Sequence, residues 1–174
     1  ERIVRLKQIR DRYESFEKNK IIQIMSQLRH HLINMDEIDK ICKQINEHER
    51  FIAYGSPTLL NLLFDFQVDM KIFDKTVLLS SVNNGKILVP KNNDLIGLFT
   101  ATGRLLGCCD AKFQEVVLDT KNTKILFSKS QINSEYIDFS FSMDTDNDYY
   151  EMHYVFLFLF DLIKTRYYEL YIKE

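Results

Sequence analysis

An acidic run near the C-terminus, Asp144-Thr145-Asp146-Asn147-Asp148, places carboxylates at the spacing with which an EF-hand loop begins to bind Ca²⁺. That loop also needs glycine at its sixth position and glutamate at its twelfth. This chain has Tyr149 and Val155 at those positions. The calcium pattern therefore fails, and we interpret the run as a solvated turn before a helix.

Imidazole and thiol groups in the first fifty residues could bind a metal. They are His30, His31, Cys42 and His48. None of them forms the Cys-x-x-Cys or His-x-x-x-His spacing of a zinc site, and adjacent histidines on a helix point about 100° apart. The sequence therefore predicts no metal site, and His31 is interpreted as a polar residue on the apolar face of a helix.

The adjacent pair Cys108-Cys109 could support redox chemistry. On a strand these neighbours would point to opposite faces, and only Arg104 and Lys112 lie near enough in sequence to activate a thiolate. We interpret both cysteines as structural. The odd total of three cysteines and the absence of an Asn-x-Ser/Thr sequon favour an intracellular location, in the cytoplasm or the nucleus.

Motifs for phosphate-loop nucleotide binding and for a nucleophile elbow are absent from the chain. An enzyme would need a dispersed site, in which His153 converges with Asp138 or Asp161 in a cleft. We predict instead that the protein is not an enzyme and has no catalytic residues and no cofactor.

Charge is distributed unevenly along the chain, although the net charge is only −2. Residues 1–31 carry eight Lys/Arg and four Asp/Glu, whereas residues 131–163 carry seven Asp/Glu and no Lys or Arg. The acidic residues interspersed in the basic segment favour a solvated helix face over a nucleic-acid surface. The longest uninterrupted apolar run, 154–160, is too short to span a membrane.

The first fifty residues have the apolar period of an amphipathic helix. The stripe over 21–45 is wider than a coiled-coil seam, because Met25 and Leu32 extend it, whereas the stripe over 1–16 is narrow enough for a coiled coil. A second helix could begin near Met35, capped by Asn34 or Asp36. The predicted interface comprises Leu6, Ile9, Tyr13, Phe16, Ile21, Ile24, Leu28, His31, Met35, Ile38 and Ile45.

The breaker Gly55-Ser56-Pro57 predicts the boundary between a helical arm, 1–54, and a sheet domain, 55–174. A short helical turn over 58–64 leads into the sheet domain. Alternation over 65–72 predicts a strand. Three hairpins are then predicted around Asn83-Asn84-Gly85, 101–103 and 119–123, followed by a strand over 136–143.

The last stretch, 148–174, fits two structures. Its many aromatic residues favour strands, with a turn at 163–166. As a helix, it would place Met152, Phe156, Leu159, Ile163, Tyr167 and Leu170 on one face. We favour the helix because this periodicity separates the apolar from the charged residues.

Together these patterns predict an α+β fold. A long N-terminal helical arm precedes an antiparallel meander of about six to eight strands, and a C-terminal helix packs on the sheet. The predicted function is a non-catalytic assembly module that binds protein partners, as a homo- or hetero-oligomer, through the arm. The alternative is a ligand- or peptide-sensing β domain whose helix transmits a signal. The chain is expected to be a fragment of a longer protein, because it begins at Glu1.

Overall fold

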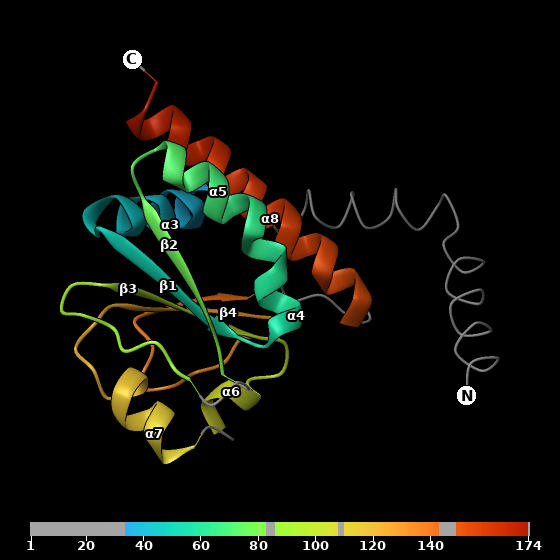
Figure 1. Cartoon of the computed structure of the whole chain (residues 1–174). Helices are drawn as coiled ribbons and strands as arrows, with labels where there is room; N and C mark the ends of the chain where they lie inside the picture. The colour runs from blue at the N-terminus through green and yellow to red at the C-terminus, as the bar shows by residue number, and fades with distance from the viewer. Residues whose placement is uncertain (1–33, 83–85, 108–109, 143–148, 174) are drawn as a thin grey trace, which may run out of the picture. The chain divides into compact units, whose positions relative to one another are not determined.

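The computed structural model describes residues 34–82, 86–107, 110–142 and 149–173, and these residues contain a parallel β-sheet of five strands (Figure 1). The strand order across the sheet is β2-β1-β3-β4-β5. The strands are β1 (Arg50–Gly55), β2 (Thr76–Ser81), β3 (Leu95–Thr100), β4 (Lys124–Ser128) and β5 (Phe139–Ser142).

Every pairing in this sheet is parallel, so the predicted antiparallel meander and the α+β class are wrong. Phe51 in β1, for example, lies opposite Val77 on one side and Leu95 on the other. Parallel strands in the middle of a sheet are covered on both faces and have continuous apolar sequences. The run Leu95–Thr100 is buried at all six positions, which is this pattern and not the alternation of a half-exposed meander.

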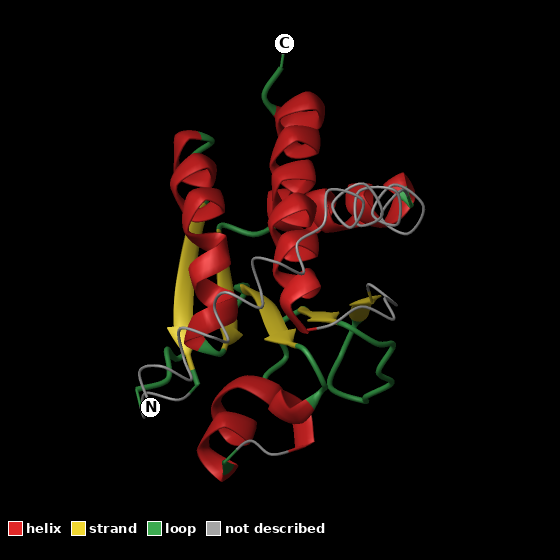
Figure 2. Cartoon of the chain, turned by 90° about the vertical axis from the view of Figure 1, so that its right-hand side faces the viewer, coloured by secondary structure: helices red, strands yellow, loops and turns green. Residues whose placement is uncertain are grey.

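Helices cover both faces of the sheet (Figures 1 and 2). On one face lie α3 (Met35–Glu47), α5 (Phe64–Ile72) and α8 (Tyr149–Tyr171). On the other face lie α6 (Arg104–Gly107), α7 (Ala111–Phe113) and the π-helical segment Gln114–Leu118. Between β1 and α5, the chain forms α4 (Pro57–Leu60) and a 3₁₀ turn over Asn61–Leu63.

Aromatic rings fill the space between the sheet and α8. Phe99 and Phe127, on neighbouring strands, stack with ring centroids 4.7 Å apart. Phe160 of α8 contacts both rings, at 5.5 and 5.4 Å, and also reaches Phe66 of α5 at 4.9 Å. One aromatic side chain of α8 therefore joins two strands and a second helix in the same core.

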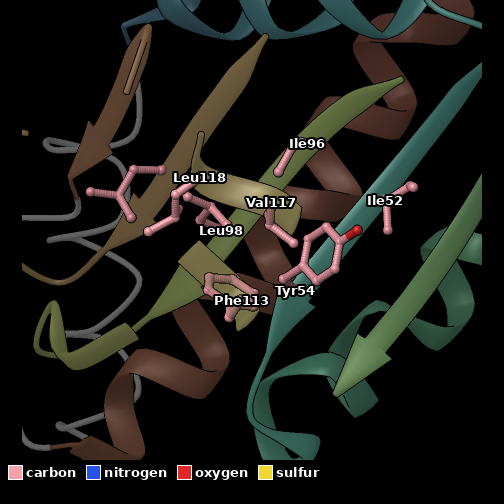
Figure 3. Close-up of a cluster of buried hydrophobic side chains, with 8 residues drawn as sticks. Ile52, Tyr54, Ile96, Leu98, Phe113, Val117 and Leu118 are labelled. Carbon is pink, nitrogen blue, oxygen red and sulfur yellow. The ribbon is translucent and has the colours of Figure 1, made fainter. Parts of the chain in front are cut away.

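The second core lies on the opposite face of the sheet (Figure 3). There the alternate strand residues point toward the short helices, and the Tyr54 ring packs edge-on against Phe113 at 5.7 Å. This buried cluster comprises Ile52, Tyr54, Ile96, Leu98, Phe113, Val117, Leu118 and Leu126.

The C-terminal stretch is a helix, as favoured by its apolar period. Phe156, Leu159, Ile163 and Tyr167 are all buried. Leu170, predicted for the same face, is 40% exposed because the helix extends beyond the sheet there.

Polar contacts fix α8 against its neighbours. Arg166 forms a two-pronged ion pair with Asp39 of α3, with donor–acceptor distances of 2.7 and 3.0 Å. This contact lowers the pKa of Asp39. Lys164 pairs with Asp69 of α5 at 2.8 Å. The two pairs set the position of α8 relative to both adjacent helices.

The predicted strand over 65–72 is a helix instead. Its alternating apolar residues also contain an i, i+4 pair, Phe66 and Met70, and these two are buried in α5. Phe64, Val68 and Ile72 form a separate exposed stripe. Alternation over nine residues therefore matched two stripes of one short helix, and packing against the sheet selected the helix.

The predicted hairpin partners are also wrong. Residues 104–107 and 113–118 are helical, and residues 86–89 form no strand. Asn83-Asn84-Gly85 lies outside the described residues. Strand formation was predicted correctly for 76–81, 95–100, 124–127 and 139–142, and the helical turn after Ser56 is confirmed as α4. The error lay in the connections, which cross over the faces of the sheet instead of turning back.

The chain divides into compact units at residues 33 and 34, whereas the sequence had suggested a division after residue 54. The helix predicted to begin near Met35 is α3, although Asn34 makes no side-chain capping bond. Ile38 and Ile45 are buried in the core of this unit, and Met35 is half-buried. The other predicted interface residues lie outside the described part, so the interface itself stays a prediction.

Among the described helices, none is long and apolar enough to cross a membrane.

Candidate functional site

Hydroxyl side chains follow the apolar run of every strand in the sheet. β1 ends at Gly55-Ser56, β3 at Thr100, β4 at Ser128, and β2 and β5 both end in serine. Because all five strands are parallel, these hydroxyl groups are placed along one edge of the sheet. We call this the carboxyl edge.

The chain reverses its direction of growth at one place along this edge. From β1 it moves outward to β2, and then returns to place β3 on the other side of β1. In open parallel sheets, ligands bind outside the carboxyl ends of the strands at such a switch point. The crevice between the ends of β1 and β3 is therefore the candidate site.

The β1 side of this crevice is the turn into α4. Ser56 is extended, and its Oγ accepts a hydrogen bond from Leu59 N–H at 3.5 Å, which starts the helix. Pro57 occupies the first helical position, where a missing N–H has no cost. A Cβ on Gly55 would lie 3.0 Å from both Cβ and O of Phe99, so glycine permits the close approach of β1 to β3.

The β3 side is the segment 101–104, which we call the β3 loop. Thr100 is buried at 6% exposure, whereas Thr102 and Arg104 are exposed. Gly103 has a φ of +76°, a left-handed conformation that glycine adopts without strain. Its carbonyl accepts a hydrogen bond from Leu106 N–H at 2.9 Å, which leads the loop into α6.

The charge at this site is positive. Segments 55–59, 100–107 and 128–131 contain no Asp or Glu, and they carry Arg104 and Lys129. Hydroxyl groups and backbone N–H groups beside these cations are the groups that bind phosphate and other anions. The chemistry of the crevice is therefore that of an anion site.

Charges at the opposite edge have structural partners. Arg50 forms a two-pronged ion pair with Asp94, and the Nε–Oδ1 distance is 2.8 Å. Burial opposes the ionisation of Asp94, but hydrogen bonds from Arg50 and Lys91 N–H hold its pKa below the usual value. Lys124 Nζ donates to the carbonyls of Thr120 and Asn122. These groups serve the fold and are not available to a ligand.

The dispersed site considered for an enzyme does not form. Asp138 accepts a hydrogen bond from Lys124 N–H at the start of β4 and β5, at 2.8 Å. Asp161 is exposed on α8 and pairs with Lys164 at 2.7 Å. His153 lies near the start of α8, and burial lowers the pKa of its imidazole. These three side chains belong to separate parts of the molecule.

The cysteine and histidine candidates of the described region are structural. Cys42 is buried under α8, and its thiol donates to Ile163 O at 3.5 Å. His48 Nδ1 lies 2.7 Å from Gln44 O, where α3 ends. Among the described residues no cluster of three metal-ligating side chains occurs. The acidic run 144–148, His30, His31, Cys108 and Cys109 lie outside this region.

A shallow hollow of about 240 Å³ opens between α3 and the β4–β5 side of the sheet. Its lining combines Glu37, Lys40 and Asp138 with the rings of Phe139 and Phe141. The hollow faces α3 and does not include the loops that follow β1 and β3, so it is separate from the candidate site.

Sequence reasoning missed the hydroxyl groups at the strand ends. The signal was present, because Tyr54-Gly55-Ser56, Phe99-Thr100 and Phe127-Ser128 each place a hydroxyl directly after an apolar run. Such repeats identify a site only when the strands are parallel. The predicted antiparallel order would have divided these groups between two edges.

No family model and no curated protein matches this sequence. Solved structures do match the fold. A hypothetical protein of Methanococcus jannaschii, for which the structure infers a 3-hexulose-6-phosphate isomerase function, has a TM-score of 0.68 at 14% identity; the match covers 86% of this chain and 87% of that one.

Two further similar structures were solved with ligands. The Vibrio vulnificus NanR protein, complexed with ManNAc-6P, has a TM-score of 0.68 at 11% identity, over 97% of this chain and 68% of that one. An E. coli CFT073 protein in complex with arabinose 5-phosphate has a TM-score of 0.59 at 14% identity, over 89% and 93% of the two chains.

These likenesses correct the functional prediction as well as the fold. The non-catalytic assembly module, its β-domain alternative and the exclusion of an enzyme were all based on an antiparallel domain, which this chain does not contain. Structures with the observed architecture include one with an inferred sugar-phosphate isomerase function. The described chain has the Rossmann-like α/β architecture of the SIS fold, a five-stranded parallel sheet with flanking helices.

Proposed function

We propose that this domain binds a phosphorylated sugar in the crevice between the carboxyl ends of β1 and β3. The observation that carries this proposal is the pair of acid-free loops at the switch point, Gly55-Ser56 and Thr100–Arg104. A phosphate group carries about two negative charges near neutral pH and accepts several hydrogen bonds. Exposed hydroxyls, loop N–H groups and Arg104 supply complementary donors.

The similar structures support a phosphosugar over other anions. One has an inferred 3-hexulose-6-phosphate isomerase function, and two were solved as complexes with ManNAc-6P and arabinose 5-phosphate. Their identity to this chain is 14% or lower, so the ligand proposed for this chain depends on the site as well as on the fold.

Aldose–ketose isomerisation is the reaction proposed for this site. The reaction moves a proton from C2 of the sugar to C1 and shifts the carbonyl group from C1 to C2, which requires an acid–base group. His153 is the described imidazole on the element that follows β5, whereas His48 precedes β1 at the opposite edge. Burial lowers the pKa of His153, which keeps the ring neutral near pH 7 and able to accept a proton.

Calorimetric titration tests the binding proposal. Ribose 5-phosphate, fructose 6-phosphate and ManNAc-6P are titrated into the protein beside the same sugars without phosphate. We expect heat of binding for at least one phosphorylated sugar and none for its unphosphorylated form. Binding that ignores the phosphate, or no binding by any of the three, would contradict the proposal.

A hydroxyl deletion locates the site. Thr102→Val keeps the shape of the side chain and removes one donor to the phosphate, so affinity should fall roughly tenfold. The matched control is Thr165→Val on α8, whose hydroxyl donates to Asp161 O at 2.8 Å. Equal affinities in the two variants would place the ligand elsewhere.

Sensing of a sugar phosphate is the second candidate function. The likeness to the ManNAc-6P complex extends over 97% of this chain, compared with 86% for the isomerase-like structure. Proton NMR of a bound sugar phosphate in D₂O separates the two functions. An isomerase exchanges the C2 proton and forms the second sugar, and a sensor leaves the sugar unchanged. His153→Gln should abolish the exchange if His153 is the base.

We also propose that the protein acts inside the cell as an oligomer. Sugar phosphates are charged and do not diffuse across membranes, and Cys42 is a buried free thiol. The amphipathic stripe predicted over residues 1–16 supports self-association. Sedimentation equilibrium of the full chain checks the oligomer, and a monomer at all concentrations would contradict it.

A further inference from the structure

We propose that Ile132, in the segment after β4, is a positioning residue that sets the conformation of the β3 loop and through it the affinity for the phosphosugar. This inference rests on the proposed function. A Cβ on Gly103 would lie 2.7 Å from Ile132 Cδ1 and 3.6 Å from its Cγ1. The Ile132 side chain therefore lies directly against the backbone of the loop.

The backbone around Ile132 is joined to the same loop. Thr100 and Ser128 are opposite each other in the last pairing of β3 and β4. Beyond that pair, Lys129 N–H donates to Ala101 O at 3.4 Å. Ser128 Oγ donates to Ser130 O at 2.7 Å and closes the turn after β4. The segment 129–132 thus extends the strand pairing into the β3 loop.

The far end of the loop is fixed as well. Leu106 N–H donates to Gly103 O, and Leu105 and Leu106 pack against the buried cluster of the α7 face. Ile132 is half-buried against the same cluster. It therefore lies between this cluster and the left-handed residue of the loop, and it limits the movement of Gly103.

Thr102 is the exposed residue that these contacts hold in place. It lies between Ala101, whose carbonyl is bonded to Lys129, and Gly103, whose backbone contacts Ile132. A loop fixed in this way presents its hydroxyl and N–H groups in one arrangement before the ligand arrives. Small displacements of groups that bind a ligand cost affinity even when no ligand contact is removed.

Ile132→Ala tests this role, with Ile137→Ala as the matched control. Ile137 is also half-buried and packs against the same cluster. Both variants should lose similar thermal stability. Affinity for the sugar phosphate that binds wild-type protein best, measured by calorimetry, should fall roughly tenfold in Ile132→Ala. The control should keep wild-type affinity. Ile132→Val, which lacks only Cδ1, should recover most of the loss.

Amide hydrogen exchange of the unliganded full chain gives a readout that needs no ligand. Residues 101–106 should exchange faster in Ile132→Ala than in wild-type protein or in Ile137→Ala. Unchanged exchange there, or equal affinity loss in both variants, overturns the role of Ile132. If wild-type protein binds no sugar phosphate, the proposed function fails, and the exchange experiment still decides whether Ile132 holds the loop.

Discussion

Gly97 shows how closely the core is packed at the scale of one residue. A Cβ at this position in β3 would lie 2.5 Å from Cζ of Phe51 and 2.9 Å from Cε2 of Phe99. Two aromatic rings thus occupy the space that any other side chain would need, and glycine is required by packing and not by a turn.

Gly97→Ala should therefore lower the free energy of unfolding by about 1–3 kcal/mol, because the rings must move to admit a methyl group. Urea denaturation at neutral pH measures the loss. Gly107→Ala is the control, since a Cβ on Gly107 meets nothing within 4 Å, and alanine favours the helix. Equal urea midpoints for the two variants would contradict this account of the core.

Cys42 offers a prediction about reactivity. Burial, with a smaller contribution from Asp39, raises the pKa of its thiol to about 12. The thiolate is the reactive form, so Cys42 should resist iodoacetamide at pH 8 in the folded protein and react when urea is added. Mass spectrometry of the peptide containing Cys42 distinguishes it from Cys108 and Cys109. Rapid modification of the folded chain would show that α8 does not cover this thiol.

At the scale of elements, the amino ends of β1 and β3 are joined by the buried Arg50–Asp94 pair. The side chain of Asp94 is only 5% exposed. Its folded pKa lies below the ordinary 3.8. The pair therefore stabilises the fold at pH values above the unfolded pKa, and this stabilisation is lost as the pH falls through the folded pKa.

Asp94→Asn should cost on the order of 3 kcal/mol at pH 7, because Arg50 keeps its charge and loses its partner. The difference from wild type should shrink when urea denaturation is repeated near pH 3, where the wild-type carboxylate becomes protonated. A difference that stays constant across this range would show that the charge of Asp94 is not what stabilises the strand ends.

Elements also explain which sequence patterns misled. Alternation over 65–72 predicted a strand, but an apolar residue at every second position also supplies the i, i+4 pair of a helix, Phe66 and Met70. The aromatic stretch 149–171 gave the opposite ambiguity. There the 3.6-residue period, extended over five turns or more, outweighed β propensity, and the helix prediction is confirmed.

For the whole molecule, the strand order predicts which fragments fold. Residues 34–174 contain the sheet and both of its helical layers, so this fragment should unfold cooperatively and bind the same sugar phosphate as the full chain. A fragment starting at Ser56, the predicted start of the sheet domain, lacks α3 and β1. Because β1 lies between β2 and β3, that fragment should not fold.

Circular dichroism with urea, together with calorimetric titration, compares the two fragments. A folded fragment from Ser56 would show that β1 is dispensable and would contradict the strand order. Loss of binding by residues 34–174, despite a folded sheet, would show that part of the ligand site lies before Asn34.

The sequence by itself determined the local structure wherever one pattern was long or had a distinctive end. It predicted the apolar strands at 95–100 and 124–127, the helix start at Ser56-Pro57 and the long C-terminal helix. Only the tertiary structure decided the direction of the strands, because a continuous apolar run has the same sequence in either direction. The parallel order in turn places Ser56 and Thr102 at one edge, and so the candidate site depends on a choice made by packing of the helices on both faces of the sheet.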